Sequence, residues 1–153
     1  MNLPNSEKIK KIVKQFFDKM GFEVSVEIKS PQELTIPISL TAKEPQVLIG
    51  KNGETLFEIQ RLLKIILKKA IAPGKSFYLD VDINEYKKKK REYLKELARM
   101  SADEVFLSKE EKNFPPMNAY ERRIIHLELS LRGDVVTESV GEGAERRIVI
   151  KPA

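Results

Sequence analysis

The apolar residues in the first half of the chain change their spacing several times, and the order of these changes allows few folds. Helical spacing comes first, and alternation of apolar and polar residues follows over 22–28 and 34–40. Helical spacing then returns on both sides of a Gly-x-x-Gly segment, Gly50 to Gly53, and a third alternating stretch covers 77–83. This pattern predicts the order helix, strand, strand, helix, helix, strand, with the two glycines between two helices.

The ends of the predicted helices carry recognisable signals. Asn5 is a capping candidate for the first helix, and Gly21 terminates it. Pro45 suits the first turn of the short helix, and Pro73 stops the long one. We expect the long helix to bury a single apolar stripe, made of Leu56, Phe57, Ile59, Leu62, Leu63, Ile66 and Leu67.

The first two alternating stretches are separated by Ser30-Pro31-Gln32, which predicts a hairpin. Pro37 lies in the second stretch, and a proline has no backbone N–H to give to a neighbouring strand. We therefore expect that strand to lie at an edge of the sheet or to carry a bulge at Pro37.

Composition narrows the class of protein only moderately. The 153 residues include no cysteine, which excludes disulfides and thiolate metal sites. The chain contains no apolar run of membrane-spanning length, and its N-terminus does not have the order of a signal peptide, so a cytoplasmic location is expected. The net charge of +5 suits an anionic partner, but it is shared between the two halves. Any nucleic-acid site must then be a local patch on a folded surface.

The Gly50 to Gly53 segment is the first candidate site. Glycines allow a sharp bend and a close approach by a sugar-phosphate chain, and amides at the start of the next helix face phosphates. Lys51 adds a mobile positive charge. Taken alone, four residues of this kind describe an ordinary turn between two helices equally well.

The order of elements, together with the apolar Leu48-Ile49 that leads into the loop, resembles the type II, or prokaryotic, KH domain. The resemblance covers 5–83 and implies an α-β-β-α-α-β domain spanning 1–83. In that family the loop clamps the backbone of single-stranded RNA, and the bases lie along an apolar groove beside it. The residues that take this RNA-binding role by resemblance are Ile49, Gly50, Lys51, Asn52, Gly53 and Glu54.

The second half of the chain reads as a smaller unit, from 84 to 153. Asn84 is a capping candidate for a helix that extends to about Phe106, and 108–117 is expected to be a loop. Asn118 and Glu121 have the spacing of a capping box at the start of another helix. Two strands follow, over 135–140 and 146–151.

The second candidate site lies on the helix that Asn118 opens. At 100° per residue, Arg122, Arg123 and His126 fall within one polar sector, opposite an apolar face. Arginine can fork onto a phosphate, and histidine can donate to phosphate oxygens or stack on a base. A merely solvated helix face explains these residues about as well.

The Arg-x-x-x-His pattern, with two strands after it and a Glu-Arg-Arg-Ile-Val-Ile ending, resembles the R-three-H single-stranded nucleic-acid-binding domain. That domain is named for this arginine and histidine, and the resemblance assigns Arg122 and His126 to RNA binding. Arg123, Arg146 and Arg147 are weaker candidates for nucleic-acid contacts. The whole chain is then α+β, a type II KH domain followed by a small α/β R-three-H domain.

A KH domain followed directly by an R-three-H domain is similar to the bacterial Jag family, also called SpoIIIJ-associated or KhpB-like proteins. The resemblance implies an RNA-binding, post-transcriptional regulator, linked in some lineages to cell elongation and cell shape. Many members carry a further N-terminal domain and a basic linker ahead of the KH helix. The implied partners are single-stranded RNA, a second KH protein in a dimer, and, indirectly, the membrane insertase encoded beside the family's gene.

No enzyme activity, metal or cofactor is expected. The chain has one histidine and no cysteine, and it shows no nucleophile elbow, phosphate-binding lysine loop or metal-ligand cluster. Asp80 and Asp82 share a strand face, which could suggest a Mg²⁺ pair, but a plain polar surface is the favoured interpretation. The alternatives to RNA binding are a protein-interaction adaptor and a binder of single-stranded DNA.

Overall fold

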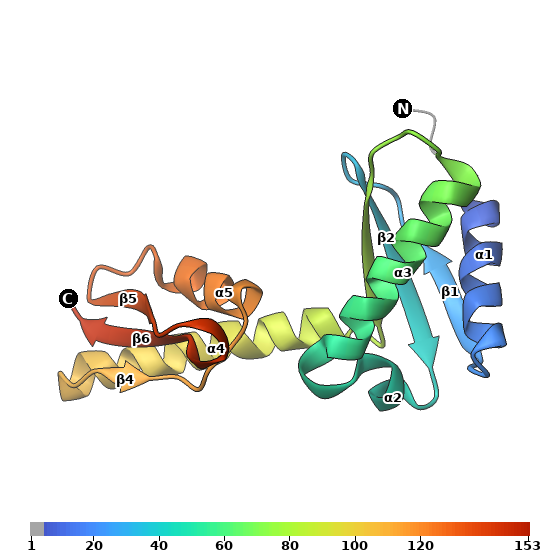
Figure 1. Ribbon diagram of the computed structural model, residues 1–153. Coiled ribbons are helices and arrows are strands. Elements are labelled where there is room, and N and C mark those ends of the chain that lie inside the picture. Colours follow the sequence, from blue (N-terminus) through green and yellow to red (C-terminus); the bar gives the residue numbers. More distant parts are fainter. Residues whose placement is uncertain (1–4) are drawn as a thin grey trace. The chain divides into compact units, whose positions relative to one another are not determined.

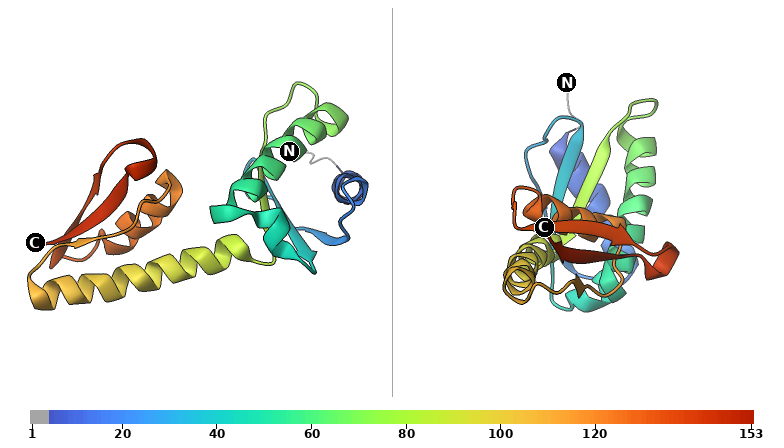
Figure 2. Two further views of the ribbon diagram at one scale, coloured as in Figure 1. Left: turned by 60° about the horizontal axis from the view of Figure 1, so that its bottom comes forward. Right: turned by 90° about the vertical axis from the view of Figure 1, so that its left-hand side faces the viewer.

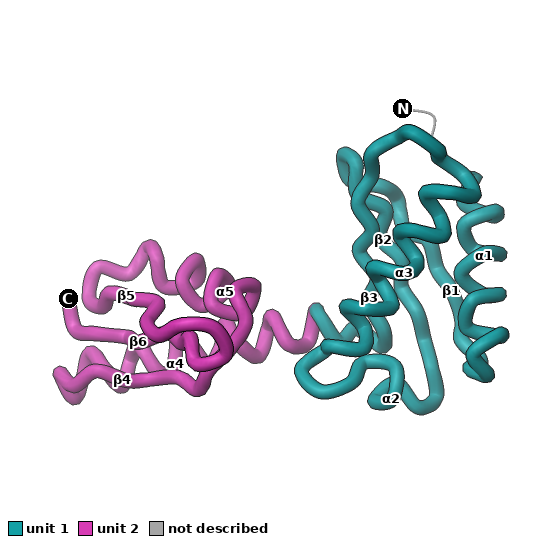
Figure 3. The backbone as a smooth tube through the Cα atoms, viewed as in Figure 1, with its two compact units in different colours: residues 1–87 teal, residues 88–153 magenta. Residues whose placement is uncertain are grey.

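The computed structural model describes residues 5–153, which divide into two compact units (Figure 3). The first unit ends at Lys87 and the second begins at Lys88. Each unit has a three-stranded sheet and its own hydrophobic core. The α+β class is therefore confirmed, and the elements follow the predicted order.

The first unit combines an α1–β1–β2–α2–α3–β3 order with a mixed sheet (Figure 1). The strand order is β1-β2-β3, with β1 antiparallel to β2 and β3 parallel to β2. Its elements are α1 (Ser6–Lys19), β1 (Val24–Ile28), β2 (Thr35–Ala42), α2 (Pro45–Ile49), the 3₁₀ turn η1 (Lys51–Gly53), α3 (Glu54–Ile71) and β3 (Tyr78–Ile83).

One face of this sheet forms the core of the first unit. Burial alternates along β2, where Ile36, Ile38 and Leu40 are buried and their neighbours are partly exposed. Helices α1 and α3 cover that face, and α1 is seen end-on in the left view of Figure 2. Phe17 of α1 and Leu63 of α3 are completely buried. The amphipathic spacing of both helices thus serves a single core.

The stripe predicted for α3 is only partly correct. Its Leu56, Ile59, Leu63 and Leu67 are buried, whereas Phe57, Leu62 and Ile66 are exposed. The sheet covers only one side of a helix, so residues at the margins of a broad apolar stripe stay in contact with solvent.

The prediction for Pro37 is wrong, because β2 is the central strand and is continuous through this residue. Pro37 accepts a hydrogen bond from the Lys29 amide at 3.0 Å, just beyond the last residue of β1. Proline has no N–H to donate, and the position where that hydrogen bond would form lies where the pairing with β1 ends. The sheet accommodates Pro37 without a bulge because nothing at that point requires its N–H.

The sequence suggested that Asn84 caps the next helix, but it does not. Helix α4 (Tyr86–Ser108) begins two residues later, and Asn84 and Glu85 both have left-handed backbones, with φ of 49° and 58°. The Asn84 side chain instead accepts from the Ala42 amide and donates to the Ala42 carbonyl, each at 2.9 Å. Asn84 thus joins the end of β3 to the end of β2.

The second unit packs α4 and α5 against an antiparallel sheet of order β4-β6-β5. The loop expected over 108–117 contains the short strand β4. The remaining elements are β4 (Lys112–Asn113), α5 (Ala119–Leu129), β5 (Val135–Val140), the 3₁₀ turn η2 (Gly143–Glu145) and β6 (Arg147–Pro152). None of the helices within 5–153 has the length and apolar content that a membrane span requires.

The predicted capping box at the start of α5 is confirmed. The Asn118 side chain accepts from the Glu121 amide at 2.9 Å, and the Glu121 carboxylate accepts from the Asn118 amide at 3.3 Å. Glu121 is buried, and it also pairs with the Lys90 ammonium of α4 at 2.6 Å. A buried carboxylate needs such partners, so this residue joins the start of α5 to α4.

Arg132 forms a second connection within this unit, after α5 ends. Its guanidinium donates from Nε and Nη2 to the two oxygens of Asp134, at 2.9 and 2.6 Å, and from Nη1 to Asp103 of α4 at 2.8 Å. The hydrogen bonds from Arg132 hold the pKa of Asp134 below its ordinary value. The Arg132–Asp134 pair lies immediately before β5 and stabilises the turn that leads into this strand.

Replacing Asn84 with glycine should lower the free energy of unfolding by about 1–2 kcal/mol, because the two hydrogen bonds to Ala42 are lost. Glycine tolerates positive φ, so this change isolates the hydrogen bonds. Asn84→Ala should cost about 1 kcal/mol more, because it adds left-handed strain. Urea denaturation followed by circular dichroism measures both, and equal stabilities of wild type and Asn84→Gly would contradict the assignment.

An Arg132→Met variant should have its largest stability deficit at neutral pH. A carboxyl group whose pKa is lowered by folding stabilises the protein above its ordinary pKa, about 4, and this contribution disappears as pH falls through the lowered value. The gap between wild type and variant in urea melts should therefore shrink as the pH drops below about 4. A gap that stays constant there would contradict the role given to the Arg132–Asp134 pair.

Candidate nucleic-acid interface

The Gly50–Gly53 loop is a tight left-handed reversal between α2 and α3. Gly50 ends α2 by donating to the Gln46 carbonyl at 3.0 Å, and its φ is 72°. Asn52 and Gly53 follow with φ of 54° and 79°. A Cβ on Gly50 would overlap the Thr55 side chain. Glycine at position 50 is thus required both by its backbone conformation and by the close approach of α3.

The outer surface of this loop is open and positively charged. Lys51 and Asn52 are exposed, and their side chains form no hydrogen bond or ion pair with any other residue in 5–153. Gly53 caps α3 with its backbone alone, so no side chain occupies the first amides of that 18-residue helix. The amide of Glu54, the first residue of α3, donates to the Lys51 carbonyl, and the helix dipole attracts an anion to this end.

Two other loop candidates have different surroundings. Ile49 is half-buried and packs against the core of the first unit, so it joins the loop to the sheet. Glu54 is exposed in the first turn of α3, where its charge suits the helix dipole. Glu54 would also repel a phosphate, so a sugar-phosphate backbone would have to approach the loop from the side of Lys51.

In the second unit, Arg122 is only partly available to a ligand. Its Nη1 donates to the Met117 carbonyl at 2.6 Å, immediately before α5, and the residue is half-buried. The Met117 amide in turn donates to the Arg146 carbonyl at 3.1 Å. The backbone of Met117 therefore connects two of the arginines that the sequence singled out.

His126, one turn after Arg122, is exposed and has a partner that the sequence did not indicate. Its Nδ1 lies 2.5 Å from the Thr137 hydroxyl of β5. This contact orients the imidazole and leaves Nε2 as the outward ring nitrogen. The alternating pattern of β5, which places Thr137 and Ser139 on one face, could have suggested such a partner.

The remaining arginines do not all converge. Arg123 is exposed on α5. The Arg146 guanidinium donates to the Gly141 carbonyl at 3.0 Å, and the Arg147 guanidinium donates to Asn113 of β4 at 3.3 Å. These bonds point to opposite sides of β6, whose neighbours in the sheet are β5 and β4. The Arg146 carbonyl contacts Met117, which also binds Arg122, but neither the Arg146 guanidinium nor the Arg147 guanidinium bonds to Arg122.

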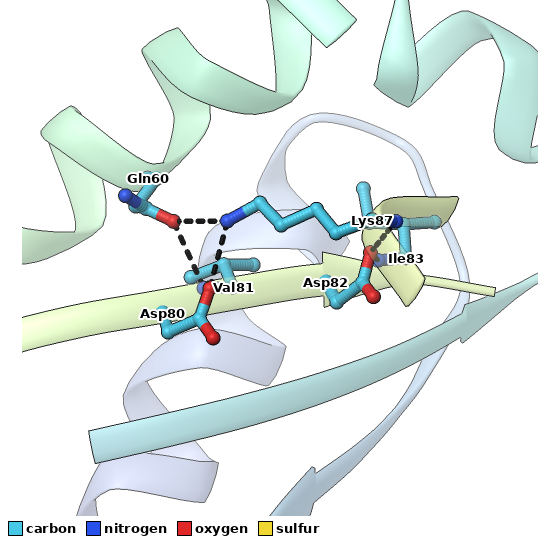
Figure 4. Close-up of polar contacts among 6 residues, drawn as sticks. All are labelled: Gln60, Asp80, Val81, Asp82, Ile83 and Lys87. Carbon is cyan, nitrogen blue, oxygen red and sulfur yellow. Dashed lines mark hydrogen bonds and ion pairs between the residues drawn. The ribbon is translucent and has the colours of Figure 1, made fainter. Parts of the chain in front are cut away.

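Asp80 and Asp82 take part in an internal hydrogen-bond network (Figure 4). Asp80 pairs with the Lys87 ammonium at 2.8 Å, and Asp82 accepts from the amides of Ile83 and Lys87 at 2.9 Å. Residues 5–153 contain no group of three or more potential metal ligands.

Residues 87–91 are four lysines followed by an arginine. Two of these lysines, Lys87 and Lys90, have carboxylate partners.

Comparison with known proteins gives one domain match and several relatives. The family model of the R-three-H domain matches residues 92–152. A protein of Clostridium symbiosum named RNA-binding protein KhpB is 33% identical over 147 residues, covering 94% of this chain and 64% of the relative. The protein of that name from Bacillus subtilis is 36% identical over 118 residues, covering 76% and 56%.

A third relative of that name, from Lactiplantibacillus plantarum, is 34% identical over 104 residues, covering 68% of this chain and 32% of the relative. The chain thus spans less than two thirds of the length of these relatives. The similarity nevertheless extends over nearly all of this chain, including the segment that precedes the R-three-H domain. The second unit thus matches the R-three-H domain, and the chain is similar across both units to proteins named KhpB, the Jag family that its motifs resemble.

Proposed function

We propose that the chain binds single-stranded RNA at two sites and acts in the cytoplasm as a post-transcriptional regulator. A KH-type domain over 1–83 supplies the first site, and an R-three-H domain over 84–153 supplies the second. The observation that carries the proposal is the Gly50–Gly53 loop, which combines an exposed lysine with helix amides that no side chain caps. The relatives are named RNA-binding proteins, which supports it.

At the first site, the loop accommodates the sugar-phosphate backbone. Glycines remove side chains from the path of the strand, and the N-terminal amides of α3 donate to phosphate oxygens. Lys51 neutralises a phosphate charge, and Asn52 offers both a donor and an acceptor. Ile49 provides the apolar edge on which a base can rest.

At the second site, His126 and Arg122 take the leading roles. The Nδ1 contact with Thr137 leaves Nε2 of His126 to meet a phosphate or a base. Arg122 uses one nitrogen on Met117 and has further N–H groups for a phosphate. Arg123, Arg146 and Arg147 add positive charge to the same unit.

Binding, rather than catalysis, is the activity that these residues support. The only histidine of the chain contacts a threonine hydroxyl through Nδ1, where a strong general base would have a carboxylate. Two modest sites on one chain strengthen each other through effective concentration when both engage the same strand. Contacts with phosphates also make affinity fall steeply with salt.

A protein-interaction role is the second candidate, and the exposed side of α3 favours it. Phe57, Leu62 and Ile65 are 60%, 50% and 57% exposed there. Apolar surface on a folded unit commonly marks a protein contact. A second KH protein, bound as a dimer partner, is the occupant proposed, and an indirect link to the membrane insertase would pass through such an assembly.

Reversing the charge of the loop tests the RNA proposal. Replacing both Lys51 and Asn52 with aspartate should weaken binding to single-stranded RNA by about tenfold or more, because phosphates are repelled. A matched control replaces Lys75 and Ser76 with aspartate, which changes the charge equally in the exposed segment that follows α3. The measurement is fluorescence anisotropy at low salt, alongside crosslinked RNA recovered from cells. Equal affinities for the two double variants would refute the loop as a binding site.

Replacing Arg122 and His126 together with alanine tests the second site. We expect about a fivefold to tenfold loss of RNA affinity and a shallower salt dependence. Arg91→Ala removes one exposed arginine from α4 and serves as the control. Repeating the titration with DNA of the same sequence separates an RNA binder from a general single-strand binder. If the double variant binds as tightly as the control, these two residues are structural.

A further inference from the structure

The backbone that joins β3 to α4 is strained. Asn84 and Glu85 are consecutive non-glycine residues with left-handed conformations. This conformation brings a Cβ too close to the following carbonyl oxygen, and such strain persists only where surrounding contacts impose it. A strand and a helix can be joined without such strained residues. The contacts at this junction therefore indicate what the strained conformation positions.

Side chains of the first unit hold this junction in place. Asn84 makes its two hydrogen bonds to Ala42. One oxygen of Asp82 accepts from the amides of Ile83 and Lys87, which closes the turn around the start of α4. These bonds place the first two residues of α4, Tyr86 and Lys87, next to α3.

Tyr86 lies directly behind the glycine loop. A Cβ built on Gly53 would be 3.1 Å from the ring carbon Cε1 of Tyr86 and 3.5 Å from its hydroxyl oxygen. The ring is half-buried and packs against the core of the first unit. The ring therefore lies against Gly53 from the side of the core, and any larger residue at position 53 would press on it.

Lys87 secures the helix that follows the loop. Its ammonium donates to Gln60 and to Asp80, each at 2.8 Å, and Gln60 also accepts from the Val81 amide at 2.9 Å (Figure 4). Gln60 lies in the second turn of α3, whose first amides border the loop. The start of α4 thus holds both the loop, through Tyr86, and the helix behind it, through Lys87.

We propose that Tyr86 is a positioning residue for the Gly50–Gly53 loop, and that Lys87 assists it by holding α3 through Gln60. The proposal rests on the RNA-binding function given above. A loop with three left-handed residues has alternative conformations, and a strand that binds it must select one of them. A ring behind Gly53 limits that choice before binding, which raises affinity without any contact to RNA.

The decisive comparison uses the full chain and three tyrosine variants. Tyr86→Leu removes the ring but keeps an apolar side chain, and Tyr86→Phe retains the ring. Tyr93→Leu makes the same change at a tyrosine of α4 that is 63% exposed. The probe is a fluorescein-labelled pool of single-stranded RNA of random sequence, and amide hydrogen exchange of the peptide covering 50–54 reports on the loop.

We expect Tyr86→Leu to bind RNA about fivefold more weakly and to exchange faster at 50–54, because the loop loses its support. Tyr86→Phe should restore both values to within about twofold of wild type. Wild-type affinity and exchange in Tyr86→Leu, or an equal effect of Tyr93→Leu, would overturn the proposal. The proposed function fails separately, if the aspartate variant of Lys51 and Asn52 binds normally.

A second variant covers the case in which Tyr86→Leu does not fold. Lys87→Met keeps the aliphatic stem and removes the ammonium that holds Gln60 and Asp80. Faster exchange at 50–54 and about a threefold loss of affinity, with an unchanged thermal midpoint, would support the same coupling. Unchanged exchange at 50–54 in Lys87→Met would overturn it.

Discussion

The parallel pairing of β2 with β3 determines where the glycine loop can lie. Parallel strands cannot be joined by a tight turn, so the chain must cross from the end of β2 to the start of β3 through α2 and α3. The sharpest bend of this crossover falls between its two helices, beside the end of the central strand. The buried face of the sheet holds α3, and the N-terminus of α3 therefore presents its amides at that position.

Much of this arrangement could be predicted from local patterns, because apolar spacing reflects which face of an element is buried. The capping box at Asn118 was equally readable, since its partners are three residues apart. The errors at Pro37 and Asn84 share one cause, which is distance along the chain. Pro37 is tolerated because β1 ends opposite it, and Asn84 binds Ala42, which is 42 positions away. Neither neighbour is visible in a local window.

The candidate sites divide in the same way. Lys51, Asn52 and His126 are exposed, as their positions in the pattern implied. Arg122 is partly committed to Met117, and Thr137 orients His126 from a strand that follows. Sequence spacing places residues on a helix face, but it does not say which of them form hydrogen bonds within the protein. That distinction decides which arginines can serve a ligand.

The start of α4 shows how one short segment can serve two purposes. The sequence favoured a plain polar surface for Asp80 and Asp82 of β3. In the structure these aspartates bind the turn and the lysine that position this helix. The same turn brings Tyr86 against Gly53, a residue far earlier in the chain. A glycine in a binding loop is usually explained by what approaches from outside. Here the space beside Gly53 on the inner side is also filled, so its lack of a side chain is required from within the protein as well.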